Sequence, residues 1–73
     1  MVFNVIIQKD KNGYFAQVPE LNGCFSQGDS LEEVDKNIKE AIELYLETMD
    51  KEEIQELHQK NSFIRPLEVL IEK

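Results

Sequence analysis

The chain is poor in the residues that commonly stabilise very small proteins or give them chemistry. Its 73 residues include one cysteine, Cys24, and one histidine, His58, and no tryptophan. A single cysteine excludes a disulfide within the chain, and one Cys with one His cannot fill the four positions of a structural zinc site. Because a chain of this length has a small core, it often needs another source of stability. Elimination leaves association with another chain, either a second copy or a different protein.

Long apolar runs and export signals are also lacking. No stretch approaches the roughly 20 apolar residues of a membrane span. Residues 1–7 lack the basic region and the cleavage site of a signal peptide. A lone cysteine fits a reducing compartment. We therefore expect a cytoplasmic protein that makes no contact with membranes.

Basic side chains are few, and acidic ones are concentrated in one segment. The net charge is −7, from 15 acidic and 8 basic residues, and residues 31–56 alone hold ten acids and three bases. An acidic surface repels phosphate, so direct nucleic-acid binding is disfavoured. Such a surface attracts a basic protein partner instead. The alternative interpretation is that an acidic helix face only keeps the domain in solution.

Alternation and turn residues predict three short strands near the start of the chain. The first is expected over 2–8, with apolar residues on both faces, as in a central strand or one whose outer face meets another subunit. An Asn-Gly pair at 12–13 supplies the positive φ of a tight hairpin. The second strand is expected over 14–18, ending before a proline. A third, at an edge of the sheet, is expected over 24–27.

A capped amphipathic helix follows the strands. Ser30 and Glu33 have the spacing of a capping box. Apolar residues then recur at helical spacing over 31–46, which predicts one buried stripe. An acidic pair three residues apart marks the start of a second, shorter helix over 51–60.

The end of the chain predicts a final strand. Residues 67–72 alternate between apolar and acidic side chains, and only Leu70 breaks the pattern. Because helices precede this segment, a crossover allows it to pair parallel to the first strand. The predicted fold class is α+β, with a three-stranded antiparallel meander, a capped helix and a final parallel strand (β-β-β-α-(α)-β). We expect residues 1–73 to form a single domain.

No grouping of residues supports catalysis. A catalytic nucleophile needs a base beside it, and nothing in the sequence orients Cys24 and His58 toward each other. The first predicted strand has no carboxylate for two-metal nuclease chemistry. Asp29 and Glu33 have simpler roles in a turn and in the helix cap. We therefore predict no catalytic, metal-binding or cofactor-binding residue, and a protein that is not an enzyme.

The loop after the second predicted strand is the candidate binding feature. Its apolar and acidic residues cannot all be buried, and an exposed loop of this kind beside a hairpin suits a protein contact. The alternative for Leu21 is that it covers the core beneath the loop. The predicted partner-binding residues are Tyr14, Pro19, Glu20, Leu21 and Asn22.

Residues 13–33 resemble the signature of the HicB-like antitoxin family. They read Gly-Tyr-Phe-Ala-Gln-Val-Pro-Glu-Leu-Asn-Gly-Cys-Phe-Ser-Gln-Gly-Asp-Ser-Leu-Glu-Glu. The family pattern has a tyrosine and an alanine, then Val-Pro-acidic-Leu, Gly-Cys, and Gly-Asp-Ser/Thr before a Glu-Glu helix start. Asn22 stands where the family often has proline, and Val34 where it often has alanine. The resemblance covers roughly residues 2–48 and includes Asn37, Glu40 and Ala41 of the predicted helix.

The resemblance implies a degenerate ribonuclease-H-like fold and an antitoxin function. The partner would be a small basic HicA-type toxin that cleaves mRNA, neutralised by covering its active site, and the antitoxin would form a homodimer or a higher homo-oligomer. Many HicB antitoxins have a C-terminal DNA-binding domain, but no such segment fits after residue 50, so we expect the short form. The alternative is a stand-alone, homo-oligomeric structural or small-ligand-binding protein with no toxin partner.

Overall fold

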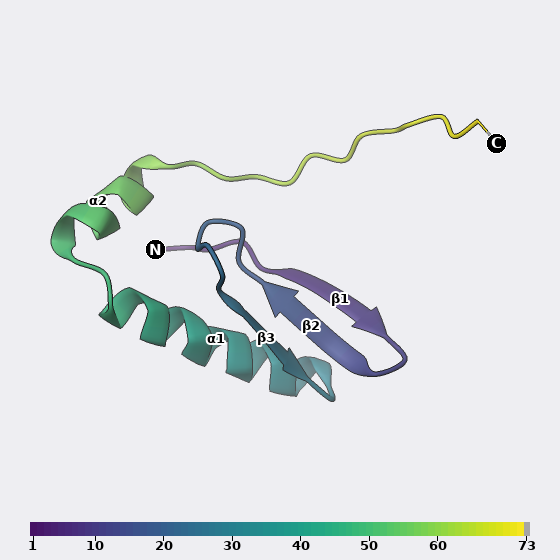
Figure 1. The fold of residues 1–73 in the computed structure, drawn as a ribbon, viewed down its shortest axis with the longest axis horizontal. Coiled ribbons are helices and arrows are strands. Elements are labelled where there is room, and N and C mark those ends of the chain that lie inside the picture. Colours follow the sequence, from purple (N-terminus) through teal and green to yellow (C-terminus); the bar gives the residue numbers. More distant parts are fainter. Residues whose placement is uncertain (73) are drawn as a thin grey trace.

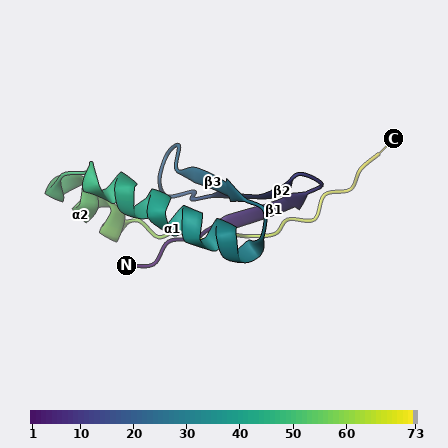
Figure 2. The same cartoon turned by 90° about the horizontal axis from the view of Figure 1, so that it is seen from below.

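The computed structural model describes residues 1–72, and within them it contains three strands followed by two helices (Figure 1). The strands are β1 (Ile6–Asp10), β2 (Gly13–Gln17) and β3 (Phe25–Gly28), and the helices are α1 (Leu31–Glu47) and α2 (Lys51–Gln59). The strands form one antiparallel sheet in the order β1-β2-β3. Helix α1 packs against β3 and β2 on one side of this sheet (Figure 2). The predicted α+β class and antiparallel meander are confirmed.

A tight turn joins β1 to β2. Asp10 pairs with Gly13 across it, and Gly13 has a φ of 127°. Asn12 has no positive φ, so the glycine alone of the Asn-Gly pair adopts the predicted conformation. A carboxylate oxygen of Asp10 accepts a hydrogen bond from the Asn12 N–H at 2.8 Å. This side-chain bond to the backbone closes the turn in the manner common for aspartate.

Helix α1 begins where the sequence predicts. The Ser30 hydroxyl accepts a hydrogen bond from the Glu33 N–H at 3.1 Å, which satisfies one of the free donors at the helix start. Val34 and Ile38 are the buried residues of its apolar stripe. A Cβ atom added at Gly28 would lie 2.7 Å from the Val34 backbone nitrogen. Glycine at this position therefore lets the end of β3 approach the first turns of α1.

Helix α2 is short and its cap is complete. Asp50 accepts a hydrogen bond from the Glu53 N–H at 2.9 Å, and the Glu53 carboxylate accepts one from the Asp50 N–H at 3.3 Å. Leu57 is the buried residue of this helix. The predicted second helix is thus confirmed, and Leu57 attaches it to the rest of the fold.

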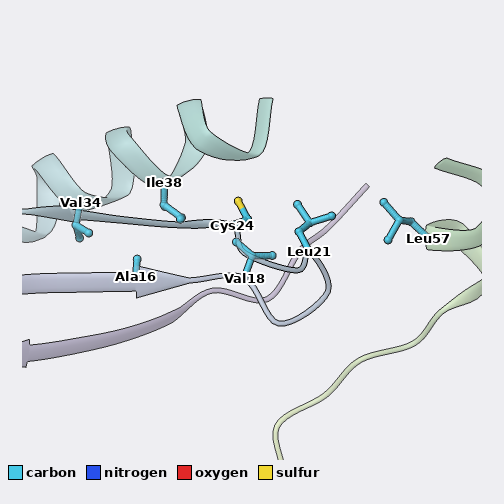
Figure 3. Close-up of a cluster of buried hydrophobic side chains, with 7 residues drawn as sticks. All are labelled: Ala16, Val18, Leu21, Cys24, Val34, Ile38 and Leu57. Atoms are coloured by element: carbon cyan, nitrogen blue, oxygen red, sulfur yellow. The ribbon is translucent and has the colours of Figure 1, made fainter. Parts of the chain in front are cut away.

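The core lies between the sheet, the loop that follows β2 and the two helices (Figure 3). Side chains from β2 and the loop point toward α1, and Leu57 of α2 lies at the end of the row, beyond Leu21. All of these side chains are small or medium-sized, which agrees with the small core expected from the chain length. The buried residues are Ala16, Val18, Leu21, Cys24, Val34, Ile38 and Leu57.

The first strand differs from its prediction in extent and in position. It covers residues 6–10, not 2–8, and it lies at an edge of the sheet, not at its centre. Residues that pair across strands share a face, so Ile7 faces α1 with Ala16, and Ile6 lies on the opposite face. Apolar side chains on both faces predict a central strand or one whose outer face meets another subunit, and the central position is wrong. They arise here because the face away from α1 is also partly apolar. The edge position predicted for the third strand is confirmed.

The predicted final strand over 67–72 does not form within the chain. Residues 60–72 have no regular secondary structure, and they extend along the β1 side of the sheet without pairing with it (Figure 1). The radius of gyration is 14.7 Å, compared with about 11 Å for a compact chain of this length. Alternation predicts which side chains would share a face of a strand, but it does not determine whether a neighbouring strand is available for pairing. The ribonuclease-H-like fold, which needs that strand, stays a prediction.

Candidate partner-binding site

The connection between β2 and β3, the 18–24 loop, is built from two consecutive turns. The Leu21 N–H donates to the Val18 carbonyl at 3.1 Å, and the Cys24 N–H donates to the Leu21 carbonyl at 3.1 Å. The Val18 N–H donates to the Cys24 carbonyl at 3.0 Å, which closes the base of the loop. These main-chain bonds hold the loop in one shape before any partner binds.

The residues of this loop are those that the two turns require. Pro19 occupies the second position of the first turn, where its fixed φ suits the conformation. Gly23 occupies the third position of the second turn and has a φ of 77°, as in a type II turn. The Val-Pro-Glu-Leu-Asn-Gly-Cys segment is therefore first a folding motif, and any binding role depends on the shape that it produces.

Three of the predicted site residues lie on the loop in different environments. Pro19 and Asn22 are exposed. Leu21 is only 2% exposed and belongs to the core, so its side chain is not part of the surface. The alternative given for Leu21, that it covers the core beneath the loop, describes its position in the structure.

Glu20, a fourth predicted site residue, links the loop to the N-terminal segment. Its Oε2 accepts hydrogen bonds from the backbone N–H of Asn4 at 3.0 Å and from the Asn4 Nδ2 at 2.9 Å. Its Oε1 is buried and has no hydrogen-bond partner within residues 1–72. Glu20 therefore positions the loop, and its carboxylate is turned toward the protein.

Tyr14, the fifth predicted site residue, lies at the other end of β2 from the loop. It pairs with Lys9 and Gly28 in the sheet. The Lys9 Nζ lies 5.6 Å from the centre of the Tyr14 ring, within the range of a cation–π contact. The structure thus does not bring Tyr14 together with the loop residues.

Two aromatic residues that were not selected from the sequence adjoin the loop. Phe15 and Phe25 lie on the face of the sheet away from α1, and their rings stack with centroids 5.7 Å apart. Phe15 is 37% exposed and Phe25 is 60% exposed. The alternation in β2 contained the signal, because Ala16 faces the core and its neighbour Phe15 must face the opposite side. We call Phe15 and Phe25 the aromatic pair.

A shallow hollow connects Phe25 of the aromatic pair to the loop. It has a volume of ≈ 200 Å³, and Phe25, Pro19 and Asn22 are among the residues that line it. Exposed apolar surface, a fixed loop and a small depression are therefore contiguous at this end of the sheet. A surface of this kind suits an inserted side chain of another protein better than a dissolved small molecule, because it is open and little enclosed.

The remaining chemistry-bearing residues are dispersed. Cys24 is buried, and its burial raises the pKa of the thiol above the ordinary value of 9.0, which disfavours the reactive thiolate. His58 is exposed on α2. In the part of the chain that the structure describes, no group of three or more His, Cys, Asp or Glu side chains could hold a metal ion. Within the same residues, no helix is both long and apolar enough to cross a membrane.

The described residues form an α+β fold with a fixed loop beside an exposed aromatic pair. The chain belongs to the HicB-like antitoxin family. The family model described as "HicB_like antitoxin of bacterial toxin-antitoxin system" matches residues 3–69. Membership indicates a role in a toxin–antitoxin system and favours a non-enzymatic one.

Similar proteins occur in distant organisms. A UPF0150 protein of Helicobacter pylori is 56% identical over 69 residues, which cover 94% of this chain and 96% of that protein. A UPF0150 protein of Synechocystis is 41% identical over 70 residues, which cover 94% of this chain and 87% of that protein. An uncharacterized 14.9 kDa protein of Haemophilus phage HP1 is 45% identical over 56 residues, 74% of this chain and 42% of that protein. No solved structure matches the chain.

Proposed function

We propose that the chain neutralises a small basic HicA-type toxin that cleaves mRNA, by binding over the active site of that toxin. One observation carries the proposal: the fixed 18–24 loop lies beside the exposed aromatic pair and shares a hollow with Phe25. Family membership supplies the class of function, and this surface supplies a place for the toxin to bind.

The loop and the aromatic pair have complementary roles in such a contact. Aromatic side chains commonly contribute most of the binding energy at protein interfaces, and Phe25 is the more exposed of the two. The main-chain bonds of the loop fix the exposed Pro19 and Asn22 in advance. A surface that is already ordered loses less entropy on binding, which favours tight occlusion of an active site.

The acidic helices supply attraction at long range. Residues 31–56, which include α1 and most of α2, hold ten acids and three bases. A basic toxin is drawn toward this charge, and RNA is repelled from it. The proposed antitoxin therefore competes with the mRNA substrate by occlusion and by charge, and it binds no nucleic acid directly.

We further propose the state in which the antitoxin works. It is a cytoplasmic single domain over residues 1–73, it has no enzymatic activity, and it assembles as a homodimer or a higher homo-oligomer. The row of exposed apolar side chains after α2 supports self-association, because such a row favours contact with another chain.

The test is to co-express the chain with the product of the neighbouring reading frame. That product is expected to be a small basic protein with a candidate catalytic histidine, to co-purify with the chain, and to lose its RNA-cleaving activity at equimolar ratio. The rate of association should fall steeply as salt is raised. A neighbouring product that is not basic, or that does not bind, would remove the support for the proposal.

The alternative is a stand-alone homo-oligomeric protein, structural or small-ligand-binding, with no toxin. The exposed apolar residues of the C-terminal segment favour it as much as they favour an oligomeric antitoxin. The two functions differ in one outcome of the same experiment. If the chain self-associates and the neighbouring product neither binds nor cleaves RNA, the stand-alone function is favoured.

A further inference from the structure

The segment that follows α2 carries a row of exposed apolar side chains. Six of its large apolar side chains are each between 65% and 85% exposed. Single exposed apolar residues are ordinary, but a row of this length is typical of a contact surface. The six residues are Phe63, Ile64, Leu67, Val69, Leu70 and Ile71.

The sheet has two edge strands, β1 and β3, and α1 partly covers the β3 edge, which leaves β1 as the more open one. The Asn37 Nδ2 donates to the Gln27 carbonyl at 2.8 Å, so the backbone of Gln27 points away from β2 and is partly covered by α1. In antiparallel sheets the outward and inward residues alternate. The backbone groups of Phe15, the partner of Gln27, must then point toward β1 and bond to Gln8. The backbone groups of the residues on either side of Gln8, Ile7 and Lys9, therefore point outward.

The C-terminal segment starts beside this free edge. The Asn4 Nδ2 donates to the Ser62 carbonyl at 2.8 Å, and Asn4 lies just before β1 in the chain. The figures agree that the segment then extends along the β1 side of the molecule (Figures 1 and 2). An unpaired strand edge and an unpaired alternating segment therefore lie on the same side of the fold.

The chain cannot pair its own alternating segment with its own β1 while this bond is kept. If the segment ran parallel to β1 from Ser62 beside Asn4, Pro66 would lie opposite the middle of β1, where it has no N–H to give. Leu67 and Glu68 would lie opposite Lys9 and Asp10, and residues 69–71 would lie beyond the end of β1. Most of the part of the segment with strand character would thus pass the end of its own edge strand.

We propose that the chain forms a symmetric dimer in which residues 67–71 of each copy pair with the β1 edge of the other. This inference rests on the self-association proposed above and names its interface. Each copy offers its open β1 edge and one unpaired segment, so a reciprocal exchange uses both and closes the assembly as a two-fold dimer. Leu67, Val69 and Ile71 share one face of the added strand, because side chains alternate.

In the dimer, this apolar face can pack beside a part of the sheet that α1 leaves less covered. Helix α1 packs against β3 and β2, so the β1 side of the same face is less covered. Ile7 lies there and is 38% exposed. In the dimer, Leu67, Val69 and Ile71 extend this face of the sheet beside Ile7. Glu68 and Glu72 point to the other side.

The experiment uses the full chain and a matched pair of double variants. Val69→Ser with Ile71→Ser removes side chains from the apolar face, and Glu68→Ser with Glu72→Ser introduces the same residue on the opposite face. Light scattering gives the mass of each protein over a range of concentrations. Amide hydrogen exchange followed by NMR reports on the backbone of Ile7, which points outward, and of Gln8, which points toward β2.

The unmodified chain is expected to be a dimer in which the amides of Ile7 and Gln8 are both protected. The apolar-face variant is expected to dissociate at least roughly 100-fold more readily. It should lose protection at Ile7 and keep it at Gln8. The acidic-face variant should retain the dimer and the protection at Ile7.

Three results would overturn the exchange: a monomer at micromolar concentration, a dimer with no protection at Ile7, or a dimer that both double variants leave unchanged. A monomer with Ile7 protected would place the segment on its own β1. A monomer that still binds the basic toxin would overturn the exchange and leave the proposed neutralising function standing. An intact dimer that fails to bind the basic toxin would overturn the proposed neutralising function and leave the exchange standing.

Discussion

Asn4 joins the 18–24 loop to the C-terminal segment through a shared side-chain amide. Its Nδ2 donates to Glu20 Oε2 at 2.9 Å and to the Ser62 carbonyl at 2.8 Å. Its backbone N–H makes a second bond to the same carboxylate oxygen at 3.0 Å. One residue near the start of the chain therefore holds the loop that faces the proposed partner and the segment proposed to enter a second copy.

Replacing Asn4 by alanine should destabilise the fold. The half-buried Glu20 carboxylate then loses one of its two donors, and we expect the free energy of unfolding to fall by about 1–3 kcal/mol. Asn22→Ala, an exposed change on the same loop, should cost about 0.5 kcal/mol or less. Urea denaturation of both variants checks this. Equal stability of the two variants would mean that the Asn4–Glu20 contact contributes nothing.

Alanine should be unfavourable at Gly28 and at Gly23 for different reasons, which asparagine can separate. At Gly28 the added Cβ lies 2.7 Å from the Val34 backbone nitrogen, so α1 must move, at a cost of about 1–3 kcal/mol. At Gly23 nothing lies within 4 Å and φ is +77°, so the cost of about 1–2 kcal/mol is backbone strain.

Asparagine tolerates a positive φ but still carries a Cβ atom. Thermal denaturation should therefore show that Gly23→Asn recovers part of the stability lost in Gly23→Ala. Gly28→Asn should recover none of the loss in Gly28→Ala. Recovery at both positions would indicate that the contact between β3 and α1 is not tight.

The two helices could be predicted well because their signals are local. Ser30 and Asp50 each bond to a residue three positions later, and both bonds are present in the structure. The hairpin was predicted for the same reason, since its turn is specified by adjacent residues. Such side-chain bonds depend on residues that are close in the sequence and not on the rest of the fold.

Features that depend on distant parts of the chain could not be predicted. The alternation of residues 67–72 has the same form whether the neighbouring strand is in the same copy, in another copy or absent. The apolar residues on both faces of 2–8 predict either a central strand or one whose outer face meets another subunit, and the sequence of one strand does not decide between them. Leu21 in the candidate site had two interpretations, and only the turns of the loop decide that it points into the core.

Phe25 should matter for binding the toxin and much less for stability. Phe25 is 60% exposed and Leu44 on α1 is 63% exposed. Leu44 is therefore a matched control on a different surface. Phe25→Ala is expected to weaken the complex at least about tenfold, which corresponds to about 1.4 kcal/mol. Leu44→Ala should leave affinity nearly unchanged. Calorimetric titration measures both, and an equal effect of the two variants would move the contact away from the aromatic pair.

The buried thiol of Cys24 should make stability depend on alkaline pH. Burial raises the pKa of Cys24 above the ordinary value of 9.0, so the folded chain binds the thiol proton more tightly than the unfolded chain. Below pH 9.0 this contribution is fully present, and it is lost as the pH rises through the folded-state pKa. The comparison is with Cys24→Ala, so that only the contribution of this thiol is measured.

The difference in unfolding free energy between the unmodified chain and Cys24→Ala should therefore shrink as the pH is raised above 9.0. The same burial predicts that iodoacetamide labels the native thiol slowly at pH 8 and labels it rapidly once urea unfolds the chain, because only the exposed thiolate reacts. Urea denaturation at several pH values and mass spectrometry of the labelled protein measure the two effects. A stability difference that stays constant, together with rapid native labelling, would place the thiol at the surface and remove Cys24 from the core.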